Sequence, residues 1–186
     1  WLCLRRCRGF HFCTDNHLPG APGGASILGT DLLIRQLLRE SDLTGVAMAA
    51  RTAGYTIGPV WHGTEGDFTT FSHACTRGQL GFHVGSESQA RWFADPIPLF
   101  VSAKSPLRLP DTGSWHGDHF KSILAKALGQ RVVSDNDRYM RDLIKSAGYD
   151  SIVYLNTKEW ADDDGDASDS MILFEPWQLK SASRAT

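Results

Sequence analysis

Short apolar segments alternate with helical patterns through the second half of the chain, and this alternation limits the fold more than any other feature. The segments SIVYLN (151–156) and MILFEP (171–176) are short enough to be strands. Two amphipathic patterns precede them, ending at Gly129 and Gly148, and a closing glycine is typical of a helix C-terminus. Helices inserted between short strands predict an α+β fold.

Further elements are expected on either side of these. They are a helix over 27–41, strands at 46–50, 55–61, 82–84 and 97–103, a helix that Ser86 caps and that runs to about Ala94, and a cap at Ser134 or Asp135 for the helix that Gly148 closes. The segment beginning LRLPDTG is expected to be a loop.

The size and charge of the chain limit its organisation and partners. At 186 residues and 20.5 kDa, we expect an N-terminal arm (1–25) and one domain (26–186). A net charge of −2 gives no indication of a nucleic-acid or membrane surface. No apolar run approaches the roughly 20 residues that cross a bilayer. These features favour a cytoplasmic protein.

Two segments carry residue types that ligate metals, and we expect neither to hold one. Three of the four cysteines lie near two histidines in the first 17 residues, but the paired CxxC spacing of zinc sites is missing. The acidic loop ADDDGDASDS (161–170) lacks the spacing of a calcium-binding loop. The cysteines do not form a disulfide framework either, which fits a reducing compartment.

The stretch WHGT places His62, Gly63 and Thr64 where an apolar strand ends. These residue types are tolerated in any turn. They would also suit a ligand clamp, because glycine lets a ligand approach the backbone while imidazole and hydroxyl supply hydrogen bonds. The three residues alone leave both interpretations open.

Three motifs in register favour the clamp. HGT (62–64) is followed by GFHVGS (81–86) and by the late strand DSMILFEPWQLKSA (169–182). Together they resemble the three motifs of the ADP-ribosyltransferase fold. The order is similar to that of the poly(ADP-ribose) polymerase-like branch, and closer to the ADP-ribosyltransferase domains in polyvalent proteins of phages and conjugative elements. The resemblance covers about residues 57–182.

The resemblance implies a split, mostly antiparallel β-sandwich with peripheral helices, which holds NAD in a cleft between the two sheets. It implies that His62 hydrogen-bonds the adenosine ribose and that the backbone of Gly63 pairs with the nicotinamide carboxamide. Thr64 matches the serine or threonine that usually follows. An exposed backbone at a glycine agrees with this role, since no Cβ blocks the carboxamide.

The second motif implies further contacts to NAD. His83 falls at its aromatic position and Ser86 lies just beyond. Trp92 or Phe93 would stack on the cationic nicotinamide ring, although one of this pair is expected to be buried because helical neighbours point about 100° apart. His83 could equally be a core histidine. The cluster Trp115, His116 and His119 is expected at the start of a surface helix.

The third motif departs from the family. Members commonly place a glutamate where this chain has Ser170, with Asp169 just before it. A serine hydroxyl can bond the ribose but carries no charge. Asp169 could supply a carboxylate only through a one-residue change of register, because strand neighbours face opposite sides. Glu175 is at an odd offset from Ser170, and Glu159 is a further source of charge.

We expect a mono-ADP-ribosyltransferase that moves ADP-ribose from NAD to a macromolecule, with His62, Asp169 and Ser170 as the catalytic candidates. A protein acceptor in a bacterial host is favoured, and a nucleic-acid acceptor stays open. Two alternatives remain: an inactive NAD-binding or ADP-ribose-binding module of a larger protein, and an NAD glycohydrolase. Fold resemblance alone does not decide among them.

Overall fold

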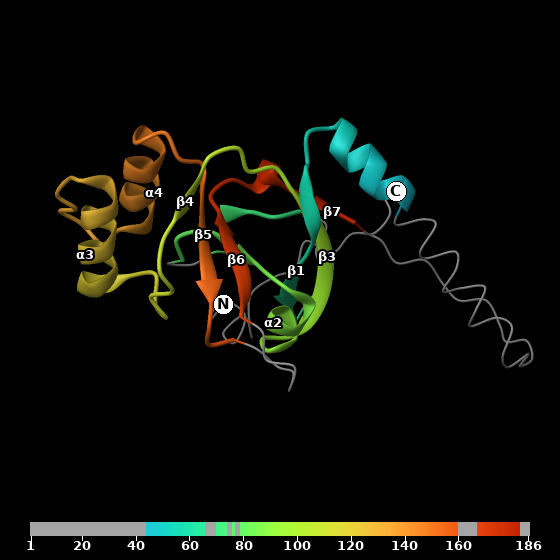
Figure 1. The fold of residues 1–186 in the computed structure, drawn as a ribbon, viewed down its shortest axis with the longest axis horizontal. Helices are drawn as coiled ribbons and strands as arrows, with labels where there is room; N and C mark the ends of the chain where they lie inside the picture. Colours follow the sequence, from blue (N-terminus) through green and yellow to red (C-terminus); the bar gives the residue numbers. More distant parts are fainter. Residues whose placement is uncertain (1–43, 66–69, 74–75, 77–78, 160–166, 183–186) are drawn as a thin grey trace, which may run out of the picture.

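The computed structural model describes residues 44–65, 70–73, 76, 79–159 and 167–182. The expected N-terminal arm, the helix over 27–41 and the cysteine–histidine segment lie outside these residues, as does most of the acidic loop. Figure 1 shows the described part as two groups of strands with helices at either end.

The strands are β1 (Ile57–Thr64), β2 (Phe82–Val84), β3 (Asp95–Val101), β4 (Pro106–Arg108), β5 (Ser151–Asn156), β6 (Ser168–Leu173) and β7 (Leu179–Ser181). The helices are α2 (Glu87–Arg91), α3 (Gly117–Leu128), α4 (Asp137–Ser146) and the 3-10 helix η2 (Pro176–Gln178), and residues 44–52 are also helical.

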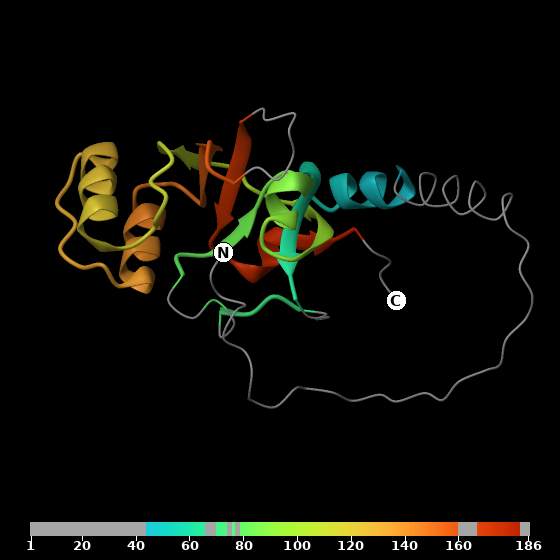
Figure 2. The ribbon, with the colours of Figure 1, turned by 90° about the horizontal axis from the view of Figure 1, so that it is seen from below.

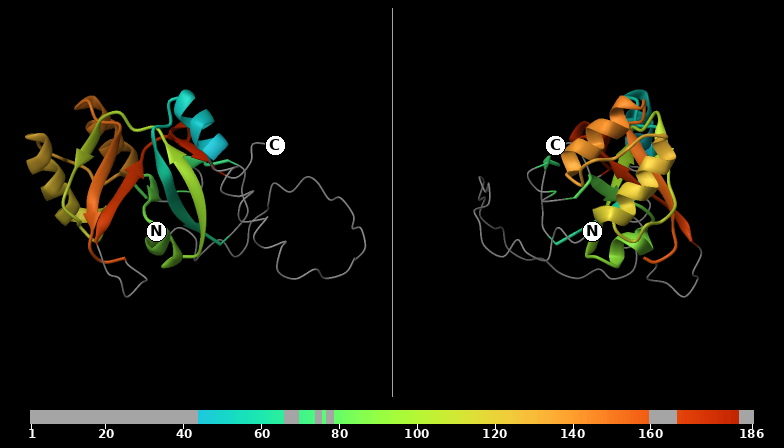
Figure 3. Two further views of the ribbon diagram at one scale, coloured as in Figure 1. Left: turned by 45° about the vertical axis from the view of Figure 1, so that its right-hand side comes forward. Right: turned by 90° about the vertical axis from the view of Figure 1, so that its left-hand side faces the viewer.

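The strands form two sheets. One has the order β1-β3-β7 and the other β2-β6-β5-β4, and every neighbouring pair is antiparallel except β4 with β5. The sheets lie at an angle to each other, with α3 and α4 beyond the β4 and β5 side (Figure 3). This arrangement confirms the α+β fold of the ADP-ribosyltransferase type, a split and mostly antiparallel sandwich.

Two apolar clusters follow from the alternation of side chains along the strands. The cluster between the sheets joins Leu99 and Val101 of β3 to Met171 and Leu173 of β6. The other cluster lies on the opposite face of the larger sheet, where α3 and α4 cover it (Figure 2). Its members include Phe120, Leu124, Met140, Ile144, Ile152, Tyr154 and Ile172, each at most 2% exposed.

Within the described residues, one isolated bridge joins the two sheets, where β1 passes the end of β2. Trp61 N–H donates to the Gly85 carbonyl at 2.9 Å, and Gly85 N–H donates to the Trp61 carbonyl at 3.0 Å. The chain then turns into α2, so the ladder stops after one pair. We call the region around this bridge the sheet junction.

Several expected elements are confirmed. The strand at 82–84 is β2, and Ser86 caps α2 with a reciprocal capping box that it forms with Gln89. Gly129 closes α3 in the left-handed conformation, at φ 65°. The capping residue Ser86 and the turn-forming residue Gly129 thus specify the start of α2 and the end of α3.

The expected strand at 46–50 is wrong, because these residues are helical. Val46, Ala47 and Ala50 recur at helical spacing and pack on Phe100 and Ala182 beside β3 and β7. A five-residue apolar run fits either kind of element, so its period did not decide between them.

Three smaller expectations also need correction. The first two residues of LRLPDTG, Leu107 and Arg108, belong to β4, whose three residues are too few to show a period. Helix α2 ends at Arg91 rather than near Ala94, because β3 begins at Asp95. The cap of α4 is Asn136, whose side chain accepts from the Tyr139 N–H, rather than Ser134 or Asp135.

Candidate functional site

The prolines of β3 determine which way the end of β1 presents its backbone. Trp61 pairs with Pro98 and Gly63 pairs with Pro96. Proline has no N–H, so these are the non-hydrogen-bonded pairs of the ladder, and the backbone groups of Trp61 and Gly63 point away from β3. The backbone N–H and carbonyl of Trp61 bond to Gly85. The backbone N–H and carbonyl of Gly63 point just beyond the end of this Trp61–Gly85 bridge.

His62 is held across the sheet junction by the backbone of β2. Its Nδ1 lies 2.7 Å from the His83 carbonyl oxygen, an obligate acceptor, so Nδ1 carries the proton and Nε2 is the acceptor nitrogen. Burial lowers the pKa of His62 and outweighs the opposing effect of that hydrogen bond. The ring also meets Phe71 edge-on, at 5.5 Å between centroids. The hydrogen bond and the ring contact therefore hold the imidazole in one orientation, and burial favours its neutral form.

Gly63 is required by packing within the chain. A Cβ built there would lie well inside van der Waals contact with the Ala90 carbonyl oxygen of α2, and 3.2 Å from the Cβ of Phe93. The helix thus crosses directly over the glycine. The absence of a side chain lets α2 approach β1, and Thr64 beside it is buried.

Helix α2 holds a buried glutamine at the sheet junction. The Gln89 Oε1 accepts from the Ser86 N–H at 2.8 Å, and its Nε2 donates to Ser168 in β6. The Ser86 hydroxyl accepts from the Gln89 N–H at 3.2 Å, so this predicted NAD contact is engaged as a helix cap. Gln89 is only 2% exposed, and the capping box fixes its side chain against β6.

Four side chains form a continuous chain of hydrogen bonds that is buried except at its half-buried Glu159 end, and we call it the polar chain. The Ser170 hydroxyl donates to Gln89 Oε1 at 2.9 Å and accepts from Asn156 Nδ2 at 3.1 Å. Asn156 Nδ2 also donates to Glu159 Oε2 at 2.9 Å. Ser170 is fully buried and Asn156 is 1% exposed. The third motif is thereby linked to α2 and to a carboxylate.

Asp169 lies apart from this group. The register pairs Ser170 with Tyr154 and Asp169 with Leu155, so the two neighbours face opposite sides of β6. Asp169 is exposed and forms a two-point ion pair with Arg108. The one-residue change of register that would put Asp169 on the face that Ser170 occupies is not present.

The two other carboxylates differ in their surroundings. Burial raises the pKa of Glu159, and the hydrogen bond from Asn156 only partly offsets it. Glu175 bonds Lys145 at 2.7 Å and His73 at 3.3 Å. Although partial burial opposes it, these two bonds lower the pKa of Glu175. Only Glu159 belongs to the polar chain.

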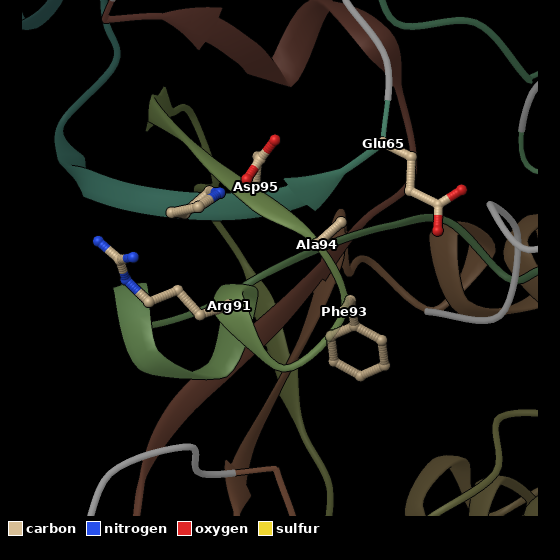
Figure 4. A pocket seen from close by; sticks show the side chains of 6 residues that line it. Glu65, Arg91, Phe93, Ala94 and Asp95 are labelled. Carbon is tan, nitrogen blue, oxygen red and sulfur yellow. The ribbon is translucent and has the colours of Figure 1, made fainter.

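The aromatic candidates are placed differently. Phe93 is half-buried beside Gly63 and lines an open depression of about 500 Å³ with Glu65, Arg91, Ala94, Asp95 and Pro96 (Figure 4). Trp92 is 59% exposed. His83 is buried in β2, and burial holds its pKa well below the usual value. Phe93 is therefore the ring that adjoins the glycine.

The cluster at the start of α3 is not brought to the sheet junction. Trp115 packs against Phe120 and Tyr154, with ring centroids 5.4 and 4.6 Å apart. His116 is the exposed N-cap residue of α3, and His119 is also exposed. The tryptophan therefore completes the core that α3 covers.

The described residues contain neither a metal-binding cluster nor a helix that could span a membrane. No group of three or more histidine, cysteine, aspartate or glutamate side chains there could hold a metal ion. No helix in the same part of the chain is long and apolar enough for a membrane crossing.

Comparison with known proteins agrees with this geometry. The profile of the family described as ADP-ribosyltransferase in polyvalent proteins matches residues 56–186, which include both sheets and the whole sheet junction. The chain belongs to this family. No curated protein and no solved structure matched the chain.

Membership in the ADP-ribosyltransferase family supports ADP-ribosyl transfer in general terms, with NAD as substrate and a macromolecule as acceptor. Within this framework the structure brings His62, Gly63, Phe93 and Ser170 to one sheet junction, through the Trp61 bridge and through Gln89 of α2.

Sequence reasoning missed two residues of the polar chain. Gln89 lies three positions after Ser86, which is the spacing of a capping-box residue. Because this local role is enough to explain a glutamine there, the sequence gives no sign of its contact with β6. Asn156 ends a strand and accepts from the Lys158 and Glu159 N–H groups, as a turn-forming asparagine does. The available signal was one amide side chain three residues after the second motif, Gln89, and another at the end of the strand that precedes the third motif, Asn156.

Proposed function

We propose that this protein is a mono-ADP-ribosyltransferase that moves ADP-ribose from NAD to a protein acceptor. In that reaction the bond between ribose C1′ and the nicotinamide nitrogen breaks with its electron pair going to the nitrogen, the acceptor bonds C1′, and the acceptor's proton leaves to solvent. The observation that carries the proposal is the convergence of His62, Gly63 and Ser170 at one sheet junction.

Each residue of the sheet junction has a group that suits NAD. The Nε2 of His62 is an acceptor for a ribose hydroxyl, because Nδ1 holds the proton. The backbone of Gly63 points past the last bridge, where its N–H and carbonyl suit a carboxamide. Phe93 offers an aromatic face for a cationic ring next to that glycine. These donors and acceptors fit the substrate.

Ser170 is proposed to bind the nicotinamide ribose in place of the usual glutamate. Its hydroxyl donates to Gln89 and accepts from Asn156, and it is fully buried, so contact between its remaining lone pair and a ribose hydroxyl requires local opening at the sheet junction. A serine gives less stabilisation to an oxocarbenium-like centre than a carboxylate, by about 2–4 kcal/mol for comparable groups. Single transfer is therefore proposed rather than chain elongation.

Incubation with NAD labelled in the adenine, in the presence of bacterial lysate, tests the proposal. Transfer predicts labelled protein and an equal amount of free nicotinamide. Free nicotinamide and labelled ADP-ribose without labelled macromolecule would indicate an NAD glycohydrolase instead. Thermal stabilisation by NAD with neither product would indicate a binding module, since a ligand that binds only the folded state raises its stability.

The pair Ser170→Ala and Asp169→Asn locates the reacting face of β6. Ser170→Ala is expected to lower turnover at least about 10-fold and to cost about 1–3 kcal/mol of stability, because it removes a buried hydroxyl with two partners. Asp169→Asn should change turnover less than twofold and stability by about 0–1 kcal/mol, as expected for an exposed ion pair. Initial rates and melting curves measure both effects. A large loss of turnover in Asp169→Asn with a normal Ser170→Ala would reverse the assignment.

A further inference from the structure

The donors and acceptors of the polar chain can be assigned without ambiguity. Gln89 Oε1 faces the Ser86 N–H, so it is the oxygen, and Ser170 must donate its proton to it. Asn156 Oδ1 faces the Lys158 and Glu159 N–H groups, so Nδ2 is the amide nitrogen that reaches Ser170. The Ser170 oxygen is thus fixed as an acceptor.

The same assignment connects Ser170 to a negative charge. One Nδ2 hydrogen of Asn156 points to Ser170, and the other points to the Glu159 carboxylate at 2.9 Å. Glu159 is half-buried directly after β5, whereas Asp169 is engaged with Arg108 on the other face of β6. Glu159 is therefore the carboxylate that the polar chain brings to Ser170.

We propose that Glu159 is a positioning residue for the ribosyl transfer, which acts through Asn156 and Ser170 and supplies the negative potential that the strand residue itself lacks. This inference rests on the proposed function. The carboxylate forms no covalent bond. It holds the Asn156 amide so that the Ser170 oxygen stays oriented, and its field favours positive charge at the reacting sugar.

The surroundings of Glu159 set the pH at which this role is available. Burial raises the pKa of the carboxyl above its ordinary value, the Asn156 bond lowers it, Asp111 raises it and Lys158 lowers it. Because the ionised form is the active one, turnover should fall as pH drops through this raised pKa. The raised pKa also means that the buried charge reduces stability at neutral pH.

Glu159→Gln tests the role with little change of shape, because the glutamine oxygen can still accept from Asn156. We expect turnover about 10–100-fold lower, an NAD dissociation constant within about twofold of wild type, and loss of the acidic limb of the pH–rate profile. The melting temperature should be unchanged or higher. Normal turnover and an unchanged pH profile in this variant, with wild type active, would overturn the inference alone.

Glu175→Gln is the matched control. Glu175 is also partly buried but bonds Lys145 and His73, away from the polar chain. We expect this variant to lose thermal stability and to keep its turnover per folded molecule. Equal losses of turnover in both glutamine variants would show that any buried glutamate matters, and would overturn the specific role of Glu159.

A measurement independent of turnover uses the carboxyl carbon of Glu159, observed by NMR. The pKa of the Glu159 carboxyl group should fall when an uncleavable carbocyclic NAD analogue binds, because the nicotinamide ring of that analogue is cationic. It should not fall when ADP-ribose binds, because ADP-ribose lacks that ring. An equal response to both ligands would overturn the inference. If wild type binds neither and turns over no NAD, the proposed function fails and this inference fails with it.

Discussion

A Gly63→Ala variant is expected to lose both folded stability and affinity for NAD. The new methyl group would overlap the Ala90 carbonyl, which is backbone and cannot rotate away, so α2 must move from β1. Overpacking of this kind costs about 1–3 kcal/mol, or roughly 3–10 °C in melting temperature for a chain of this size. Moving α2 also displaces Phe93 and Gln89 from the sheet junction. Calorimetry should then detect no NAD binding to the folded fraction.

Gly45→Ala is the control for this substitution. Gly45 lies in the helical residues 44–52, and a Cβ there meets nothing within 4 Å. Alanine favours a helix over glycine, so this variant should gain up to about 1 kcal/mol and bind NAD as wild type does. Gly63→Ala with normal stability and affinity would contradict the packing described for α2.

His62→Ala should abolish NAD-induced thermal stabilisation and lower turnover at least about 100-fold. The substitution removes the Nε2 acceptor, the bond to the His83 carbonyl and the ring that meets Phe71. We expect only about 1–2 kcal/mol of lost stability, because the imidazole is half-buried and lies at the end of β1. Thermal shift with and without NAD separates the two effects.

His73→Ala provides the comparison for His62. His73 also lies against an aromatic ring, that of Phe82, and bonds Glu175, but it is exposed. Its variant should keep NAD-induced stabilisation. If His62→Ala were stabilised by NAD as much as wild type, the proposed ribose contact would be rejected.

The pH dependence of NAD binding follows from the same imidazole. Burial lowers the pKa of His62 below its ordinary value of 6.5, so the folded protein keeps it neutral to a lower pH than the unfolded chain does. The unfolded chain then binds more protons, and stability falls as pH drops below 6.5 toward the lowered pKa. Protonation at Nε2 also removes the acceptor. NAD affinity should therefore decline as pH falls through the lowered pKa of the folded protein.

Sequence patterns specified the parts of the fold that local chemistry determines. The GFHVGS motif predicted β2 and the cap at Ser86, because caps depend on residues close together in the chain. The expected end of β1 at Trp61 was wrong, since the strand continues through HGT to Thr64. The helix at 44–52 and β4 were missed because their apolar runs are too short to show a period.

The polar chain could not be read from the sequence for a different reason. Whether Ser170 or Asp169 faces α2 depends on the register of β5 against β6, and one step of register exchanges the two faces. Gln89 and Asn156 each have a sufficient local role as a cap or turn residue, so their long-range contacts leave no separate signal.

Pro96 and Pro98 of β3 protect the register of the β1–β3 ladder. If β3 slipped by one residue along β1, each proline would face a position that needs an N–H, and the ladder would lose those bonds. The backbone N–H and carbonyl of Gly63 thus point away from β3 because Pro96 and Pro98 lack a backbone N–H. Substitution of these prolines would relax that direction without changing His62, Gly63 or Ser170.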